Sequence, residues 1–278
     1  MASSQETLSK SFLHLLEIMK TLRGPQGCPW DKAQTPPDLN AHLIEEAYEV
    51  VEAVDSRDPL WLQEELGDLL LQIVFHAQMA SEANQFHMGD VIQSISDKLV
   101  RRHPHVFGDV TVNGVQDVKT NWEKIKAEEK KAKGGDKSLL SNVPPSLPAL
   151  LKAYRLGDKA SHVGFDWPNA EGILAKIKEE VAELEAEVKA NDKEKMSDEF
   201  GDLLFSLANM ARSLKINPED ALRRTCDKFT RRFRLIEEKV ASSRKKWEEF
   251  TLEELDAFWS EAKDLENKAE AKKTDLKK

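Results

Sequence analysis

The chain of 278 residues has only two cysteines, Cys28 and Cys226, and they form neither a C-x-x-C pair nor a framework of pairs. A disulfide-based secreted fold is therefore excluded, and a reducing cytoplasm is the expected location. Residues 1–10 lack the apolar core of a signal peptide. Polar side chains interrupt the most apolar stretch, 66–80, well short of the ~18 apolar residues of a membrane span. We expect no membrane partner.

Aromatic residues and segments of alternating polarity are also scarce. Aromatics make up 7% of the chain, glycine occurs 12 times, and strand patterns are nearly absent. Helical periodicity dominates instead, which predicts an all-α fold. Charged residues make up 33% with a formal net charge of −9, which argues against nucleic acid as a general partner. The length allows one large domain or two, and an internal repeat favours two.

Several catalytic signatures are missing as well. Residues 135–138 have the composition of a phosphate loop but lack its G-x-x-x-x-G-K-[ST] pattern and a preceding strand. No histidine follows a glutamate at the third position, which disfavours a di-iron bundle. The seven histidines show no repeat between the halves, and no Ser/His/Asp or cysteine nucleophile pattern is evident.

The chain does contain two sets of four acidic residues at identical spacing. The first set is Glu46, Glu49, Glu65 and Asp68, and the second is Glu180, Glu183, Glu199 and Asp202. Each residue of the first set lies 134 positions before its counterpart in the second set, as Glu46 and Glu180 show. Grouped carboxylates repel one another unless a cation lies between them. The duplication therefore indicates two metal sites.

Each acidic set is divided between two helices expected from apolar periodicity. On ideal helical geometry Glu46 lies at the edge of an apolar stripe, and Glu49 lies about 60° further round. Glu65 and Asp68 take the same angular positions on the following helix. When the two stripes pack together, all four carboxylates converge on one cleft, and the second set repeats the arrangement.

A solvated helix face is the ordinary interpretation of one such acidic pair. The repeat favours metal ligands, because other surface positions differ between the halves, as Glu52 and Ala186 show. Gly67 and Gly201 recur beside the acids. Since glycine inside a helix is less stable than alanine by about 1 kcal/mol, its recurrence predicts close approach of a neighbouring helix.

Mg²⁺ suits these ligands, because it prefers oxygen and shares its coordination with substrate phosphates and water. We expect Mg²⁺, with Mn²⁺ able to replace it. A basic cluster also repeats, with Lys98, Arg101 and Arg102 matching Lys228, Arg231 and Arg232. These cations either complement a helix C-terminus or, as we prefer, contact phosphate. Together the clusters suggest metal-assisted attack of water on a phosphoanhydride.

A change of composition marks the domain boundary. The stretch 128–147 is rich in lysine and then in glycine and proline, which predicts a linker. It would separate an N-terminal helical domain, residues 1–127, from a C-terminal one, residues 148–278, whose Lys/Glu-rich tail is expected to be solvated.

Taken together, these motifs resemble the tandem-domain MazG nucleoside triphosphate pyrophosphohydrolases. Both acidic sets fill the family signature, E-x-x-E followed after a spacer by E-x-x-D. Further matching segments are 27–32, 101–107, 146–150, 163–167 and 228–233, and the similarity spans roughly residues 8–265. The resemblance implies two tandem MazG-like helical bundles, a homodimer, and Mg²⁺-dependent hydrolysis of NTPs and dNTPs, ATP included, to the monophosphate and pyrophosphate.

The resemblance also implies roles for individual residues. All eight carboxylates would bind metal, Lys228 and Arg232 would contact the triphosphate, and Trp259 and Lys263 would contact the nucleotide. In the N-terminal half, Lys98 and Arg102 match the phosphate-binding positions. Trp259 and Lys263 have no evident N-terminal twin, so the C-terminal site is preferred for catalysis. Trp259 also fits a core position. The expected reaction is in-line attack of water on the α-phosphorus, and the expected role is housecleaning of the nucleotide pool.

Two other functions fit the acidic sets. A dUTPase-like enzyme would use the grouped carboxylates in the same way, and strict preference for dUTP would identify it. A non-enzymatic acidic helical binding module would show neither turnover nor metal-dependent stabilisation. The sequence does not select a base, and it leaves open whether one half or both are active.

Overall fold

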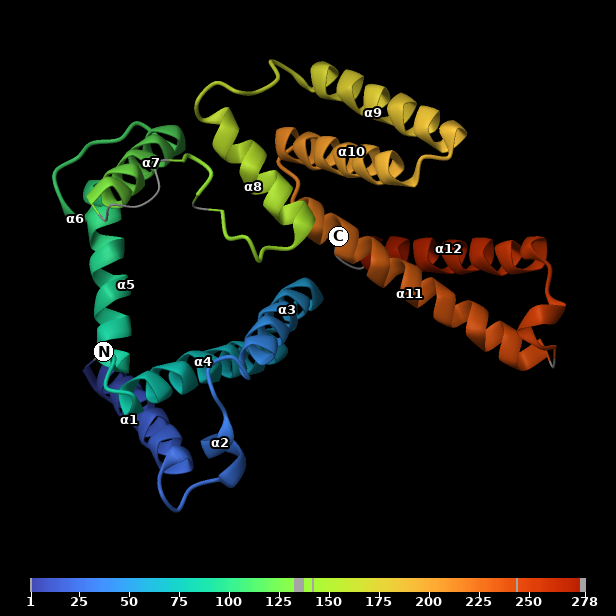
Figure 1. The fold of residues 1–278 in the computed structure, drawn as a ribbon. Coiled ribbons are helices and arrows are strands. Elements are labelled where there is room, and N and C mark those ends of the chain that lie inside the picture. The colour runs from blue at the N-terminus through green and yellow to red at the C-terminus, as the bar shows by residue number, and fades with distance from the viewer. Residues whose placement is uncertain (1, 133–137, 142, 244, 276–278) are drawn as a thin grey trace. The chain divides into compact units, whose positions relative to one another are not determined.

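A computed structural model describes residues 2–132, 138–141, 143–243 and 245–275. Every regular element among these residues is helical, which confirms the all-α prediction (Figure 1). The chain divides into two compact units, Met1–Gly134 and Gly135–Lys278. None of the described helices is both long and apolar enough to cross a membrane.

The N-terminal unit is arranged around one long helix, α4 (Pro59–Glu82), which packs against α1, α3 and α5. Helix α7 packs against α5, and this pair is called the N-terminal arm below. The helix α7 extends into the stretch 128–147 that was expected to be a linker, and part of that stretch, 133–137, lies outside the described residues. The other helices are α1 (Ala2–Arg23), α2 (Pro29–Ala33), α3 (Asn40–Ser56), α5 (Met88–Arg102), α6 (Pro104–Phe107) and α7 (Val115–Ala132).

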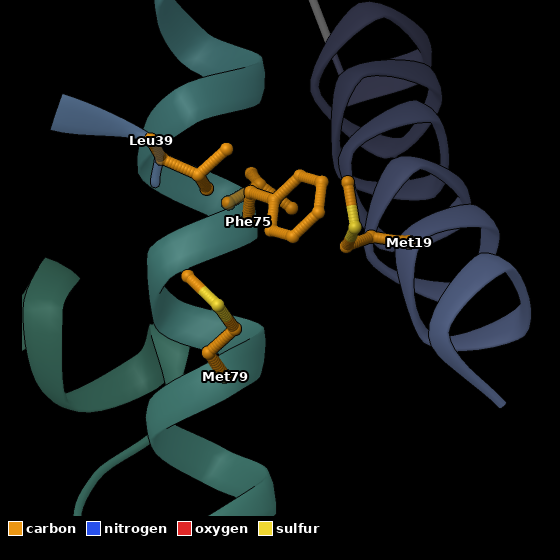
Figure 2. Close-up of a cluster of buried hydrophobic side chains, with 5 residues drawn as sticks. Met19, Leu39, Phe75 and Met79 are labelled. Atoms are coloured by element: carbon orange, nitrogen blue, oxygen red, sulfur yellow. The ribbon is translucent and has the colours of Figure 1, made fainter. Parts of the chain in front are cut away.

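The core of this unit lies between α1 and α4. Figure 2 shows Met19 of α1 facing Phe75 of α4, with Leu39 entering just before α3. Val74 and Met79 complete the buried cluster. Since burying one such side chain contributes about 1.5–3 kcal/mol, this small cluster is what holds α4 against α1 and the start of α3.

The C-terminal unit repeats the plan. Helix α10 packs against both α8 and α9, and α11 pairs with α12 in what is called the C-terminal arm (Figure 1). The helices are α8 (Ala149–Ser161), α9 (Ala170–Ala190), α10 (Lys193–Ser213), α11 (Pro218–Ser243) and α12 (Leu252–Asp275), with a 3₁₀ turn at Trp247–Glu249.

Two-residue turns join the helices of each acidic pair, and the two turns have the same construction. Arg57 and Asn191 adopt the left-handed conformation, with φ of 61° and 56°, and end α3 and α9. Asp58 and Asp192 then cap the next helix, each carboxylate accepting a hydrogen bond from a backbone N–H of the first turn. So short a turn forces the two helices to run antiparallel and in contact, which fixes the register of the acidic residues.

The contact between α8 and α10 depends on a glycine. A Cβ built on Gly157 would lie 2.2 Å from Oδ1 of Asn209, a side chain that is buried in α10. Only glycine permits this approach, so Gly157 sets how closely α8 covers the acidic hairpin.

The cap at Asp58 gives a first prediction. Asp58→Ala should lower the free energy of unfolding by about 1 kcal/mol, because the amides of Leu60 and Trp61 lose their acceptor. Asp58→Asn, which keeps an acceptor oxygen, should stay near wild type. Urea unfolding followed by circular dichroism measures both, and equal stability of the alanine variant and wild type would contradict the capping role.

Candidate metal and nucleotide sites

The α3–α4 hairpin brings three of its four predicted ligands together. Carboxylate oxygens of Glu46, Glu49 and Glu65 lie within 4.8 Å of one another. Asp68 is outside this group of three, but its charge reaches Glu46. Partial burial, followed by the charges of Asp68 and Glu49, raises the pKa of Glu46. The hairpin therefore concentrates negative charge as the sequence predicts.

Glu65 is the buried member of this cluster, with 8% of its surface exposed. Nε1 of Trp61, one turn earlier on α4, donates a hydrogen bond of 2.5 Å to Oε1 of Glu65. This bond orients the carboxylate and leaves its charge in place. In the sequence this contact is marked only by the spacing of four residues between Trp61 and Glu65, and Trp61 was not predicted to belong to the site.

The α9–α10 hairpin forms the second cluster, in which Glu180, Glu199 and Asp202 have carboxylate oxygens within 4.8 Å of one another. Here Glu183 is the residue outside the group of three. Partial burial, followed by the charges of Glu183 and Glu180, raises the pKa of Glu199. The two hairpins thus share two of these positions, Glu46 with Glu180 and Glu65 with Glu199, and the third member differs: it is Glu49 in one cluster and Asp202 in the other.

A lysine that sequence reasoning missed lies at this second cluster. Nζ of Lys176 is 2.8 Å from Oε1 of Glu180 and 2.8 Å from Oε1 of Glu179. These two hydrogen bonds raise the pKa of Lys176, which stays charged. The residue at the same place in the first hairpin is His42, whose Nδ1 lies 3.7 Å from Glu45. A fixed positive charge therefore partly compensates the C-terminal acids and not the N-terminal ones.

The C-terminal arm joins the predicted cations to the predicted tryptophan. Arg231 and Arg232 both bind the carboxylate of Glu266 on α12, at 2.9 and 2.7 Å. Cζ of Arg232 lies 5.6 Å from the centre of the Trp259 ring. Burial favours the neutral form of Glu266, but the two arginines together hold its pKa below the usual value. A pocket between the helices is lined by Arg231, Arg232, Leu235, Ala262, Leu265 and Glu266.

Both interpretations of Trp259 find support here. The ring packs on Phe229 of α11, with centroids 5.1 Å apart, as expected of a core residue. It is also only half-buried and carries Arg232 above its face. The idea that Arg231 and Arg232 complement a helix C-terminus is wrong, since α11 continues to Ser243. Lys228 is half-buried on α11, and Lys263 is exposed on α12.

The N-terminal arm is built in the same way. Arg101 and Arg102 both bind Glu129 of α7, at 2.7 and 2.5 Å, and Cζ of Arg102 lies 5.7 Å from the centre of the Trp122 ring. The expectation that Trp259 has no N-terminal twin is therefore wrong. Trp122 lies 137 positions earlier, from 122 to 259, so the repeat was hidden by a spacing that differs from that of the acids. Lys98 is half-buried on α5.

The prediction for the two helical glycines is also wrong within this chain. A Cβ built on Gly67 or Gly201 would meet no atom within 4 Å. Both residues lie next to exposed apolar side chains, Leu66 and Phe200. No described helix of the same chain packs on either glycine.

Comparison with known proteins places the chain in a family. The profile of the MazG nucleotide pyrophosphohydrolase domain matches twice, at residues 34–107 and 169–235. The nucleoside triphosphate pyrophosphohydrolase/pyrophosphatase MazG of Thermotoga maritima is 46% identical over 91% of this chain and 95% of its own length. The nucleoside triphosphate pyrophosphohydrolase of Escherichia coli K12 is 43% identical over 90% of this chain and 95% of its own. The uncharacterized protein YabN of Bacillus subtilis is 47% identical over 95% of this chain and 54% of its own. The chain belongs to the MazG family of nucleotide pyrophosphohydrolases, with two copies of the family domain.

Proposed function

We propose that the chain hydrolyses nucleoside triphosphates, ATP among them, to the monophosphate and pyrophosphate with Mg²⁺. The observation that carries the proposal is the pairing, in the C-terminal unit, of a three-carboxylate cluster with an arm of arginines and tryptophan. A nucleoside triphosphate bound to a divalent cation needs both kinds of group. Family membership supports the reaction class, and the role we assign is removal of unwanted nucleotides from the pool.

The acidic clusters fit a hard divalent cation. Oxygens of three carboxylates within 4.8 Å repel strongly when charged, and the raised pKa of Glu46 reports that repulsion after its partial burial. Glu180, Glu199 and Asp202, together with Glu183, would hold the ion in the C-terminal unit. Glu46, Glu49, Glu65 and Asp68 would hold one in the N-terminal unit. When bound, Mg²⁺ supplies charge neutralisation for the phosphate oxygens, and Mn²⁺ has the ligand preferences to replace it.

The side chains of the arm bind and orient the nucleotide. Arg232 presents a planar fork that suits two phosphate oxygens, and Lys228 adds a point charge on the same helix. Trp259 offers an aromatic surface, and Lys263 lies four residues further along α12. In the reaction the oxygen of water bonds to the α-phosphorus while the bond from that phosphorus to the bridging oxygen breaks. Pyrophosphate leaves with the electron pair, and the proton of the water leaves the site.

We also propose that the enzyme is a homodimer in the cytoplasm. Apolar side chains recur at helical spacing on open faces of the acidic hairpins: Ile44, Tyr48, Val51, Leu66 and Ile73 in one unit, and Leu174, Val181, Val188, Phe200, Leu204 and Leu207 in the other. Faces of this kind are typical of interaction sites, and homo-oligomers are the common solution. A partner helix over Gly67 and Gly201 would explain two glycines that nothing in the single chain explains. Cys28 and Cys226 are both free, as a reducing compartment requires.

The activity has a direct test. With Mg²⁺ and ATP the wild-type protein should yield AMP and pyrophosphate, and Glu199→Gln should reduce turnover by about 100-fold or more because a ligand charge is lost. Glu185→Gln, an exposed acid of the same hairpin outside the cluster, is the matched control and should retain full activity. Chromatography of the products measures both. ADP and orthophosphate as products would contradict the proposal, and turnover of dUTP alone would favour the dUTPase-like alternative.

The metal sites predict a thermal shift. Mg²⁺ at 100 times its Kd should stabilise the wild-type protein by about 2.7 kcal/mol for each site, because only the folded hairpins gather the ligands. The double variant Glu65→Gln, Glu199→Gln should lose this shift, and without the ion it should melt no lower than wild type, since each substitution removes a repelling charge. Differential scanning fluorimetry measures the shift, with Glu185→Gln again as control. An unchanged melting temperature of wild type with Mg²⁺ would count against both sites.

The dimer has its own test. Phe200→Glu combined with Leu207→Glu should convert a dimer to a monomer, because two charges enter an apolar interface. Leu252→Glu, at an exposed apolar residue of the C-terminal arm, should leave the dimer intact. Sedimentation velocity at micromolar concentration measures the mass. A wild-type protein that sediments as a monomer would refute the dimer and leave the hydrolase proposal standing.

A further inference from the structure

We propose that the N-terminal unit binds a nucleoside triphosphate of its own, with Arg102 and Lys126 on the phosphates and Trp122 beside the base. This inference rests on the proposed function, because it assigns to the N-terminal arm the ligand class of the C-terminal arm. Two of its three residues, Trp122 and Lys126, lie outside both family-domain matches, since the first match ends at 107.

The two arms share their sequence pattern as well as their contacts. Trp122, Lys126 and Glu129 follow one another at the spacing W-x-x-x-K-x-x-E, and the same spacing recurs at Trp259, Lys263 and Glu266. On a helix these three residues lie on successive turns of one face. That face of α7 meets α5 at the paired arginines, as that of α12 meets α11.

The geometry of the cation over the ring is the same in both arms. Cζ of Arg102 lies 5.7 Å from the centroid of Trp122, and Cζ of Arg232 lies 5.6 Å from that of Trp259. In each case the arginine is held by the carboxylate seven residues after the tryptophan, Glu129 in the N-terminal arm. A stacked and ion-paired guanidinium has few conformations left, so it presents its fork without a large entropic penalty.

The charge balance of the N-terminal arm favours an anion. Arg101 and Arg102 share the single carboxylate of Glu129, so two positive charges face one negative charge in this contact. Hydrogen bonds from Arg102, and then from Arg101, overcome the opposing effect of burial and lower the pKa of Glu129 to about 2. The arrangement is therefore unchanged at neutral pH, and Lys98 on the same helix adds positive charge. A triphosphate, with several negative charges, matches this surface.

The two arms differ beside the lysine, and this difference predicts unequal affinity. Nζ of Lys126 lies 2.8 Å from Oε1 of Glu123, so phosphate must compete with a carboxylate for this lysine. The residue that corresponds to Glu123 in the C-terminal arm is Ser260, which carries no charge. We therefore expect the N-terminal site to be the weaker of two.

Calorimetric titration of the full-length protein with α,β-methylene-ATP and Mg²⁺ tests the inference, because this analogue cannot be cleaved between the α- and β-phosphates. Wild type should bind two equivalents per chain in a stronger and a weaker class. Arg102→Gln with Lys126→Gln should lose the weaker class, and Arg232→Gln with Lys263→Gln should lose the stronger. Lys124→Gln, an exposed lysine of α7, is the matched control and should keep both.

Two further measurements distinguish a lost binding site from a misfolded variant. Circular dichroism must show unchanged helix content, and Arg102→Lys, which keeps the charge but loses the fork, should weaken the second class by about tenfold rather than remove it. One equivalent in wild type, abolished by Arg232→Gln with Lys263→Gln, would overturn the inference while the proposed hydrolysis stands. A wild type that neither binds the analogue nor cleaves ATP would instead remove the proposed function, and this inference with it.

Discussion

Mutual repulsion of carboxylates is the constraint on which the site depends. Each acidic hairpin holds oxygens of three acids within 4.8 Å, an arrangement that is unfavourable in isolation and raises the pKa of Glu46 and Glu199 after their partial burial. The hairpin tolerates it because the two-residue turn leaves no other register: a left-handed residue ends the first helix, and Asp58 or Asp192 caps the second. The backbone thus holds like charges close together, and a divalent cation bound there, as proposed, would relieve their repulsion.

In each arm the arrangement is reversed, and one carboxylate lies between two arginines. A single glutamate, Glu129 or Glu266, accepts from two arginines and holds one of them over a tryptophan ring. Exposed ion pairs contribute little to stability, but the guanidiniums of Arg102 and Arg232 are largely covered and stacked, so the pairing serves mainly to fix their direction. Each unit therefore has a carboxylate cluster on its hairpin and a pair of arginines in its arm. A metal-bound triphosphate would offer its cation to the carboxylates of the hairpin and its phosphates to the arginines of the arm. Its binding would therefore involve both parts of the unit.

Much of this could be predicted from sequence, and the errors have physical causes. Periodicity and the repeated acids predicted the helices and the clusters, because a strict spacing of three and four residues is a property of one helix. Trp122 was missed since the loops between helices change length freely: the acids repeat after 134 positions, the arginines of the arms after 130, as from Arg102 to Arg232, and the tryptophans after 137. The glycines were misinterpreted because a sequence does not say whether the neighbour of Gly67 belongs to the same chain. Helix α7 runs into the first part of the stretch 128–147 that was expected to be a linker, since a lysine-rich segment can continue a helix as well as end it.

The same fold arranges its two acid clusters with different neighbours, and this difference bears on what each half can do. In the N-terminal hairpin a neutral donor, Trp61, orients Glu65 and leaves the full negative charge for a cation to meet. In the C-terminal hairpin Lys176 already neutralises part of the charge at Glu180. A lysine that can exchange a carboxylate for phosphate favours binding of the anion at the very place where it must react, whereas an indole cannot make that exchange. The acidic clusters and the arms therefore recur in both units, while the residue beside the acids differs between them.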